Sequence, residues 1–151
     1  MAGTFSDYLE KKLQDEVLGG VNFAPPGTVY LALLTDTNTA AQRDAGTLTE
    51  VSTGVWTNYQ RCPVTNNTTN FPVATGVTAA KTNANDIGPL GFLSSGTTIA
   101  ASSAVTIQAA AWYDAPSGGN LLIWFDLIAA KVVANGDQFK VAAGSMNGTL
   151  D

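Results

Sequence analysis

Residues 106–127 read TIQAAAWYDAPSGGNLLIWFDL, and they are the most informative part of the sequence for the fold. Two apolar, aromatic-rich runs flank residues 116–119, where Pro presets φ and Gly is free to adopt positive φ. This pattern predicts a β-hairpin. With Asp114 paired to Asn120, small side chains would face large ones across the hairpin. The predicted pairs are Ala111 with Ile123, Ala110 with Trp124, and Ala109 with Phe125.

The second strand of this hairpin is apolar on both faces. One face is wholly apolar, and the other is interrupted only by Asp126. A strand of this kind is usually central in a sheet and covered on both sides. The hairpin is therefore predicted to be the core, and we interpret its aromatic residues as packing groups and not as a ligand site.

The composition points to one domain of low charge. The chain has 151 residues, of which 45% are apolar and 13% are charged, against about 25% charged residues in an average globular protein. This length suits a single domain spanning 1–151, with a helical segment in 1–20 and a β-sandwich in 28–151. Low charge is compatible with much of the surface lying against neighbouring chains. The net charge is −5 and the basic residues are scattered, so direct nucleic-acid binding is not expected.

One amphipathic helix is predicted over residues 6–18. Ser6 can cap its N-terminus and Gly19-Gly20 can end it. Leu9, Leu13 and Val17 lie four residues apart and form an apolar stripe. The helix should therefore lie on a surface, which is either its own sheet or a neighbouring subunit, with its own sheet favoured.

The rest of the chain has the pattern of short strands and turns. Strands are predicted over 28–35 and, with a kink at Gly54, over 50–64, and an exposed loop over 36–48. Long connections are expected over 75–98 and strand character over 97–106. Asn135-Gly136 predicts a turn between two strands, although a strict hairpin would place Lys131 opposite Lys140. The predicted fold is an all-β sandwich of about eight short antiparallel strands with one N-terminal helix.

The sequence gives little support for a catalytic or metal-binding protein. The chain has no histidine, which removes the Ser-His-Asp and Cys-His arrangements. Cys62 is the sole cysteine, so it cannot form a disulfide within the chain but could form one with another molecule. We expect no catalytic residue, no cofactor and no metal site. The alternative is a glycosidase-like pair of carboxylates, because the chain contains enough Asp and Glu residues to form one.

Targeting and membrane signals are also missing from the sequence. The first residues lack a basic region followed by an apolar run, so no signal peptide is predicted. The chain contains no run of 18 apolar residues, so no membrane association is expected.

Several stretches resemble a family of small virion structural proteins of tailed bacteriophages, labelled tail-fibre-like and related to capsid decoration proteins. The most specific are Thr4–Glu10 and the run DAPSGGNLL at 114–122. Weaker matches are residues 28–33, 46–52, 58–61, 135–137 and 142–144. The resemblance implies a non-enzymatic component of the virion that is assembled in the host cytoplasm.

Two functional hypotheses follow from the resemblance. The preferred one is a capsid decoration (cement) protein that binds the major capsid protein, because the chain lacks the repeats and heptads of a fibre shaft. The alternative is a tail-fibre or tail-tip module that binds tail proteins or a host surface. A homo-oligomer, for instance a trimer, is expected in the first case. The candidate partner contacts are Phe5, Tyr8, Leu9, Leu13, Asp36, Arg43, Asp44, Trp56 and Tyr59.

Overall fold

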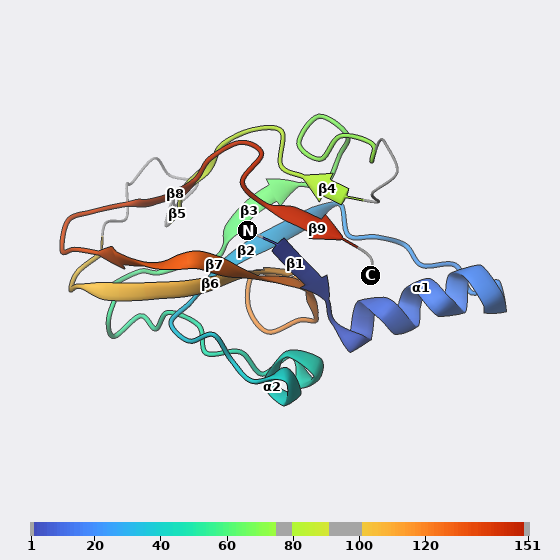
Figure 1. Ribbon diagram of the computed structural model, residues 1–151, viewed down its shortest axis with the longest axis horizontal. Coiled ribbons are helices and arrows are strands. Elements are labelled where there is room, and N and C mark those ends of the chain that lie inside the picture. Colours follow the sequence, from blue (N-terminus) through green and yellow to red (C-terminus); the bar gives the residue numbers. More distant parts are fainter. Residues whose placement is uncertain (1, 75–79, 91–100, 150–151) are drawn as a thin grey trace.

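The computed structural model describes residues 2–74, 80–90 and 101–149. A seven-stranded sheet forms the main part of the molecule (Figure 1). The strand order is β3-β2-β6-β7-β1-β9-β4, and a second sheet pairs β5 with β8. The bounds are β1 Ala2–Phe5, β2 Thr28–Leu34, β3 Cys62–Thr65, β4 Ala80–Thr82, β5 Ile87–Leu90, β6 Val105–Tyr113, β7 Leu121–Val133, β8 Phe139–Val141 and β9 Asn147–Thr149. Every pair is antiparallel except β1 with β9. Together with helix α1 (Asp7–Gly19), this confirms the predicted all-β fold with an N-terminal helix.

The predicted hairpin is β6–β7, but its register differs by one residue from the prediction. The backbone N–H of Asp114 donates to the carbonyl of Asn120 at 3.2 Å, as expected at the turn. The register then shifts between Trp112 and Tyr113, which leaves Leu122 as the extra residue of a β-bulge. Large residues still face small ones beyond the bulge. The observed pairs are Ala111 with Trp124, Ala110 with Phe125, and Ala109 with Asp126.

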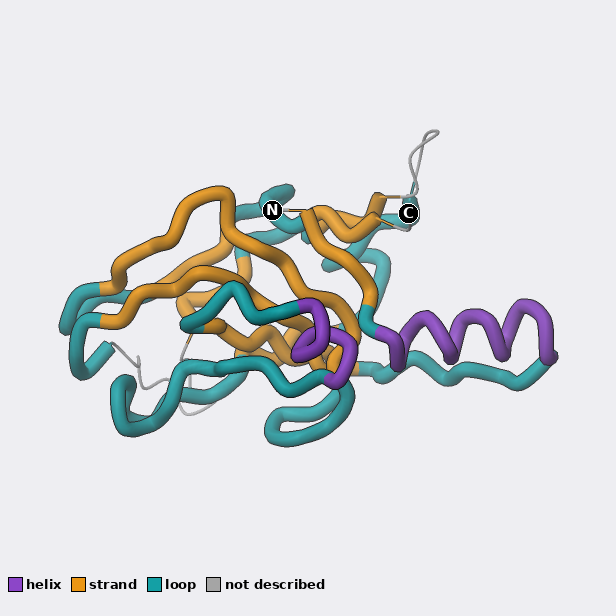
Figure 2. The backbone as a smooth tube through the Cα atoms, turned by 60° about the horizontal axis from the view of Figure 1, so that its bottom comes forward, coloured by secondary structure: helices purple, strands orange, loops and turns teal. Residues whose placement is uncertain are grey.

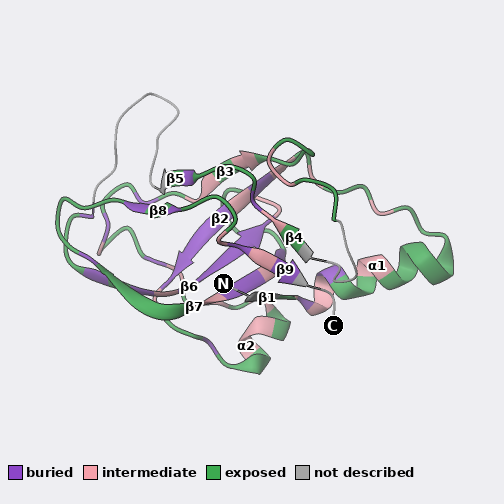
Figure 3. Ribbon diagram, turned by 45° about the horizontal axis from the view of Figure 1, so that its top comes forward, coloured by how far each residue is buried: buried purple, intermediate pink, exposed green. Residues whose placement is uncertain are grey.

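The central strands are buried on both faces, as the sequence predicts. In β2, Leu31 and Leu33 belong to one apolar cluster, whereas Ala32 and Leu34 belong to another on the opposite face. Each of these four side chains is at most 1% exposed. Figure 3 shows β2 and β6 as the buried centre of the molecule.

The small β5–β8 sheet covers one end of the larger sheet. Ile87, Phe139 and Val141 join the same cluster as Ile107 and Val133. Asn135-Gly136 does form a turn, with Gly136 at a φ of +86°. The two runs that flank this turn do not pair with each other, because β8 pairs with β5 and Lys131 pairs with Ile107 on β6. The opposition of two lysines therefore never arises.

Two segments between β2 and β4 differ from the prediction. The expected loop 36–48 contains helix α2 (Ala40–Ala45), which begins at a capping box formed by Thr39 and Gln42. The expected strand 50–64 is mostly turns, and only its end enters β3. Backbone hydrogen bonds from Trp56 to Ser52 and from Tyr59 to Trp56 close these turns at 3.0 and 2.9 Å.

The expected long connections over 75–98 lie in part outside the described residues. The part that the structure does describe contains β4 and β5, two short strands that the sequence did not reveal. Within the expected strand 97–106, residues 97–100 also lie outside the described chain, and β6 begins only at Val105.

The buried tyrosines make the stability sensitive to alkaline pH. The hydroxyl of Tyr59 accepts a hydrogen bond from the N–H of Leu33 at 2.8 Å. Burial, with Glu50 adding to it, raises the pKa of Tyr59 well above its usual 10.0, and burial likewise raises the pKa of Tyr113. Above pH 10 the unfolded state therefore binds fewer protons than the native state, so stability falls as pH rises.

We expect the free energy of unfolding to lose up to about 1.4 kcal/mol per pH unit for each of these tyrosines above pH 10. Urea unfolding at a series of pH values measures this slope. The Tyr59→Phe variant should have a shallower slope because one of the titrating groups is gone. An unchanged slope in that variant contradicts the assignment.

Candidate functional site

Helix α1 is anchored to the sheet at its first residue. Ser6 is the N-cap, and its side chain accepts a hydrogen bond from the N–H of Leu9 at 3.3 Å. The Ser6 hydroxyl also donates to the carbonyl of Leu121, and its backbone N–H donates to the carbonyl of Leu122 at 2.9 Å. The start of the helix is thus fixed to β7, where the sheet bulges. This confirms the predicted helix and its cap.

The far end of α1 projects away from the sheet (Figure 2). Along its apolar stripe Leu9 is buried and Leu13 is partly buried, but Val17 is 78% exposed. Leu18 is 85% exposed and Val21 is 58% exposed. The helix therefore packs against its own sheet, as predicted, only along its first turns. We call residues 7–24 the arm, because the chain after α1 runs back along the helix.

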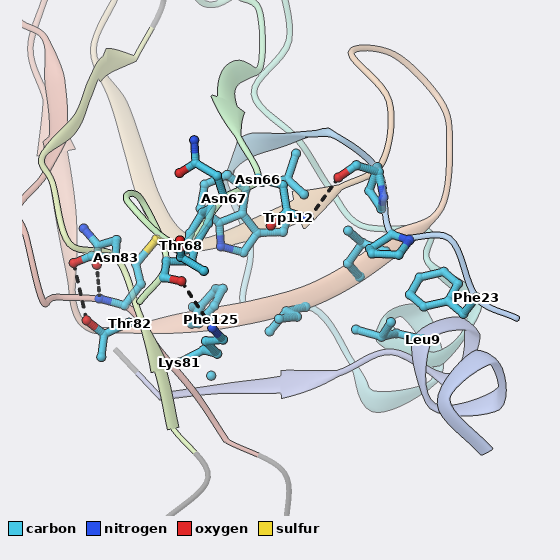
Figure 4. Close-up of a pocket in the computed structure, with 18 residues that line it drawn as sticks. Leu9, Phe23, Asn66, Asn67, Thr68, Lys81, Thr82, Asn83, Trp112 and Phe125 are labelled. Carbon is cyan, nitrogen blue, oxygen red and sulfur yellow. Dashed lines mark hydrogen bonds between the residues drawn. The ribbon is translucent and has the colours of Figure 1, made fainter. Parts of the chain in front are cut away.

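An apolar groove opens beside the base of the arm (Figure 4). Its volume is about 420 Å³, which is in the usual range of about 300–1,000 Å³ for ligand pockets. Trp112, Leu122 and Phe125 from β6 and β7 line it. Its other described lining residues come from the arm and the chain after it, the start of β2, the loop after β3, β4 and β9. They include Leu9, Phe23, Pro25, Asn66, Thr68, Phe71, Lys81, Asn83 and Met146.

The groove exists because the two edges of the seven-stranded sheet are tied together. The loop that follows the edge strand β3 hydrogen-bonds to the chain around the other edge strand, β4. The N–H of Ala84 donates to the carbonyl of Asn70 at 2.7 Å, and the Lys81 ammonium donates to the carbonyl of Pro72 at 2.6 Å. Phe71 then reaches over the sheet and meets the ring of Trp112 edge-on, with centroids 5.5 Å apart. The groove is bounded by this loop on one side and by the arm on the other.

Asn83 organises the wall of the groove formed by β4. It is 2% exposed. Its side-chain amide donates to the carbonyls of Asn85 and Ala142 at 2.9 and 2.8 Å, and its side-chain oxygen accepts from the N–H of Met146 at 3.0 Å. Its own carbonyl accepts from the N–H of Gly144 at 2.7 Å. One buried amide therefore holds the segment that leads into β9.

We expect Asn83→Ala to lower the free energy of unfolding by about 1–3 kcal/mol, because it leaves buried backbone groups without partners. The exposed Gln138→Ala is the matched control and should change stability by at most about 0.5 kcal/mol. Chemical denaturation of both variants measures the difference. Equal stabilities would show that Asn83 does not organise this wall.

Charge differs between the groove and the arm. Lys81 is the charged residue among the described residues that line the groove, and it forms no ion pair within the described chain. Near the far end of α1, Asp15 and Glu16 likewise have no ion pair with any described residue. Nearer its start, Lys11 pairs with Asp7 at 3.7 Å. A cation with no ion pair among the described residues thus borders the groove, and carboxylates that likewise lack one there lie near the end of the arm.

Helix α2 covers the other face of the sheet. Arg43 lies over the ring of Trp124 with 5.4 Å to its centroid, and its guanidinium is 3.4 Å from the carboxylate of Asp126. Arg43 also donates to the carbonyls of Thr37 and Asn38 at 2.8 and 3.1 Å. The predicted contact residue Arg43 is therefore engaged within its own chain. Its predicted companions Asp36 and Asp44 are exposed near it.

Trp56 and Tyr59 do not form a surface patch. Trp56 is 0% exposed and Tyr59 is 9% exposed, and both belong to the core cluster. Their ring centroids are 5.9 Å apart. The structure therefore places both predicted contact residues in the core, where their role is packing.

The predicted contacts at the base of the arm lie together in the structure. Leu9 lines the groove, and the partly buried Phe5, Tyr8 and Leu13 pack against the same core cluster. The groove itself was missed, because Phe71, Lys81 and Met146 are distant in sequence and meet only through the curl of the sheet. The sequence contained one weak indication of a contact surface, the apolar stripe of the helix. Its last residue, Val17, lies beyond the part of the helix that the sheet covers.

Within the described residues, Glu50 and Asp86 are engaged in ion pairs and Cys62 lies partly buried on a strand. Glu50 pairs with Arg61 at 2.9 Å and Asp86 with Lys140 at 2.7 Å. Within the described residues, no group of three His, Cys, Asp or Glu side chains could hold a metal ion. Cys62 is partly buried on β3, and burial raises the pKa of its thiol. The helices of the described chain are too short or too polar to cross a membrane.

Comparison with known proteins extends over nearly the whole chain. No curated protein matches it. A family model described as the podophage GP4 fiber I protein gp80 matches residues 4–149. This confirms the resemblance to virion structural proteins of tailed phages. The chain therefore belongs to the family of the podophage GP4 fiber I protein gp80.

Proposed function

We propose that this protein is a non-enzymatic structural subunit of the tail-fibre apparatus, which binds another virion component through its arm and groove. The observation that carries the proposal is the apolar groove beside a projecting helix whose end is uncovered. Exposed apolar surfaces of this kind usually mark sites of protein association. The description of the family, which names a fibre protein, favours the tail over the head.

The position of the carboxylates supports a structural role over an enzymatic one. Glu50 and Asp86 are held by Arg61 and Lys140. Asp114 accepts hydrogen bonds from the backbone N–H and the side-chain amide of Asn120, both at 2.7 Å. These acids fix loops and turns of the fold, which supports a structural role for them over the paired acid and base of glycoside hydrolysis.

Capsid decoration is the second candidate function. It is supported by the lack of repeats or coiled-coil heptads in the sequence, because a fibre shaft would be built from such repeats. A decoration protein would bind the assembled major capsid lattice and stabilise it by mass action. The groove and the arm would then contact capsid subunits.

Immunogold electron microscopy of intact virions with an antibody against this chain tests the proposal. We expect label at the tail, where fibres attach. Label spread over the head would refute the tail-fibre role and support decoration. Virions that carry no label would contradict both candidate functions.

A further inference from the structure

We propose that the groove binds the end of the arm of a second copy of this chain, so that copies associate through arm and groove. This inference rests on the proposed function as a structural subunit, since it names the partner of the same groove. Three observations carry it: the uncovered stripe of α1, the apolar groove and the unpaired charges of opposite sign.

The end of the arm has the chemistry of a segment that inserts into an apolar site. Among the described residues, six large apolar side chains are strongly exposed, and three of them are Val17, Leu18 and Val21. Val17 continues the stripe that Leu9 and Leu13 begin, so the helix face that packs at the base of the arm extends past its own sheet. Figure 3 shows the exposed outer turns of α1. A helix that presents an apolar face to a groove is a common mode of protein recognition.

The groove has the complementary chemistry. Trp112, Leu122 and Phe125 form an apolar lining in a volume of about 420 Å³. This space is large enough for several aliphatic side chains, since one water occupies about 30 Å³ in the liquid. Polar groups, such as those of Asn66 and Thr68, stand at the loop side of the groove.

Opposite charges favour the arm as the occupant over an unrelated apolar segment. Asp15 and Glu16 precede the exposed apolar residues of the arm, and neither forms an ion pair within the described chain. Lys81 stands in the groove, where the partners of its ammonium among the described residues are the carbonyls of Phe71 and Pro72. Apolar insertion and a carboxylate–ammonium contact can therefore form together when an arm enters the groove of another copy.

The self-association is tested first by analytical ultracentrifugation of the full chain over a range of concentrations. We expect the wild-type protein to form an assembly, and its mass counts the copies. The variant Val17→Gln with Leu18→Gln should sediment as a monomer, because the arm keeps its helix formers but loses its apolar end. The matched control is Ile128→Gln with Val132→Gln, which removes two exposed apolar side chains of β7 and should leave the assembly intact. These two residues are 95% and 61% exposed.

A second variant tests the groove and the polarity of the contact. Thr68→Trp fills the groove from an exposed position and should also give monomers. A mixture of the arm variant with the groove variant should restore association, because one intact arm can still enter one intact groove. Lys81→Glu should weaken the assembly at least tenfold, and Asp15→Lys with Glu16→Lys should restore it.

Several outcomes overturn the inference. These are a wild-type chain that stays monomeric, an arm variant that assembles like the wild type, or a mixture of the two variants that stays monomeric while each variant has a native circular dichroism spectrum. The tail-fibre role would survive such results if gold label still marks the tail. Conversely, an assembly that depends on the arm, with label on the head, would support this inference and refute the tail-fibre role.

Discussion

The Arg61→Ala variant should lose about 3–5 kcal/mol of folding free energy, because the substitution breaks a largely buried ion pair and leaves its partner carboxylate unpaired. The Arg61 side chain is 8% exposed, and its guanidinium contacts Glu50 at 2.9 Å. The same group donates to the carbonyls of Ala115 and Gly118 at 3.0 and 2.8 Å, and it stacks 3.6 Å from the centroid of Tyr113. One side chain thus holds the turn of the central hairpin.

Urea denaturation of Arg61→Ala, Glu50→Gln and the double variant measures the contribution of the pair. We expect a coupling energy of about 0.5–3 kcal/mol, because the two groups are in direct contact. Arg61→Lys should recover only part of the loss, since an ammonium cannot bind the carboxylate through two nitrogens and stack on the tyrosine. Additive losses in the double variant would contradict this account of the pair.

The Trp56→Ala variant should lose a similar amount, about 3–5 kcal/mol, through the cavity that it leaves in the core. Trp56 is 0% exposed. This loss is large against a typical total stability of about 5–15 kcal/mol. The midpoint of urea unfolding should therefore shift strongly to lower concentration.

Trp56→Phe is the matched control for this prediction. The indole N–H of Trp56 has no hydrogen-bond partner in the described structure, so phenylalanine removes a donor without breaking a bond and keeps most of the ring. We expect it to cost clearly less than Trp56→Ala. If Trp56→Ala unfolds like the wild type but the virion no longer adsorbs to cells, Trp56 acts at a surface and its assignment to the core is wrong.

The sequence correctly predicted the elements that depend on interactions between neighbouring residues. Ser6 and Gly19-Gly20 bounded α1 correctly because capping depends on adjacent residues. The hairpin turn was correct as well, since Asp114 and Asn120 hydrogen-bond across it. The register was one residue off because a bulge at Leu122 depends on packing that no local pattern reveals.

The missed features depend on contacts between distant segments. The segment 50–64 does not form the predicted strand. Turns bring its aromatic residues into the core, and Asn58 takes a positive φ of 61°. The α2 helix had a local signal, the Thr39 and Gln42 capping box, which its polar composition obscured. The groove could not be predicted from the sequence, since it forms only where the loop after β3 meets β4 across the curled sheet.

The structure also explains one of the two most specific parts of the family resemblance, the run at 114–122. Residues 114–122 form the turn of the central hairpin, which Asp114 closes and Arg61 holds through two carbonyls. Arg61 lies in another of the stretches that carried the resemblance, 58–61. Both stretches therefore serve the fold, and Leu122 at the end of the first also lines the groove.

A cryo-electron microscopy reconstruction of the intact virion would show directly what occupies the groove in the assembled particle. We expect density for the end of the arm of a neighbouring copy, with Val17 and Leu18 against Trp112 and Phe125 and with its carboxylates near Lys81. A groove filled by a different virion protein, or left open to solvent, would contradict this expectation.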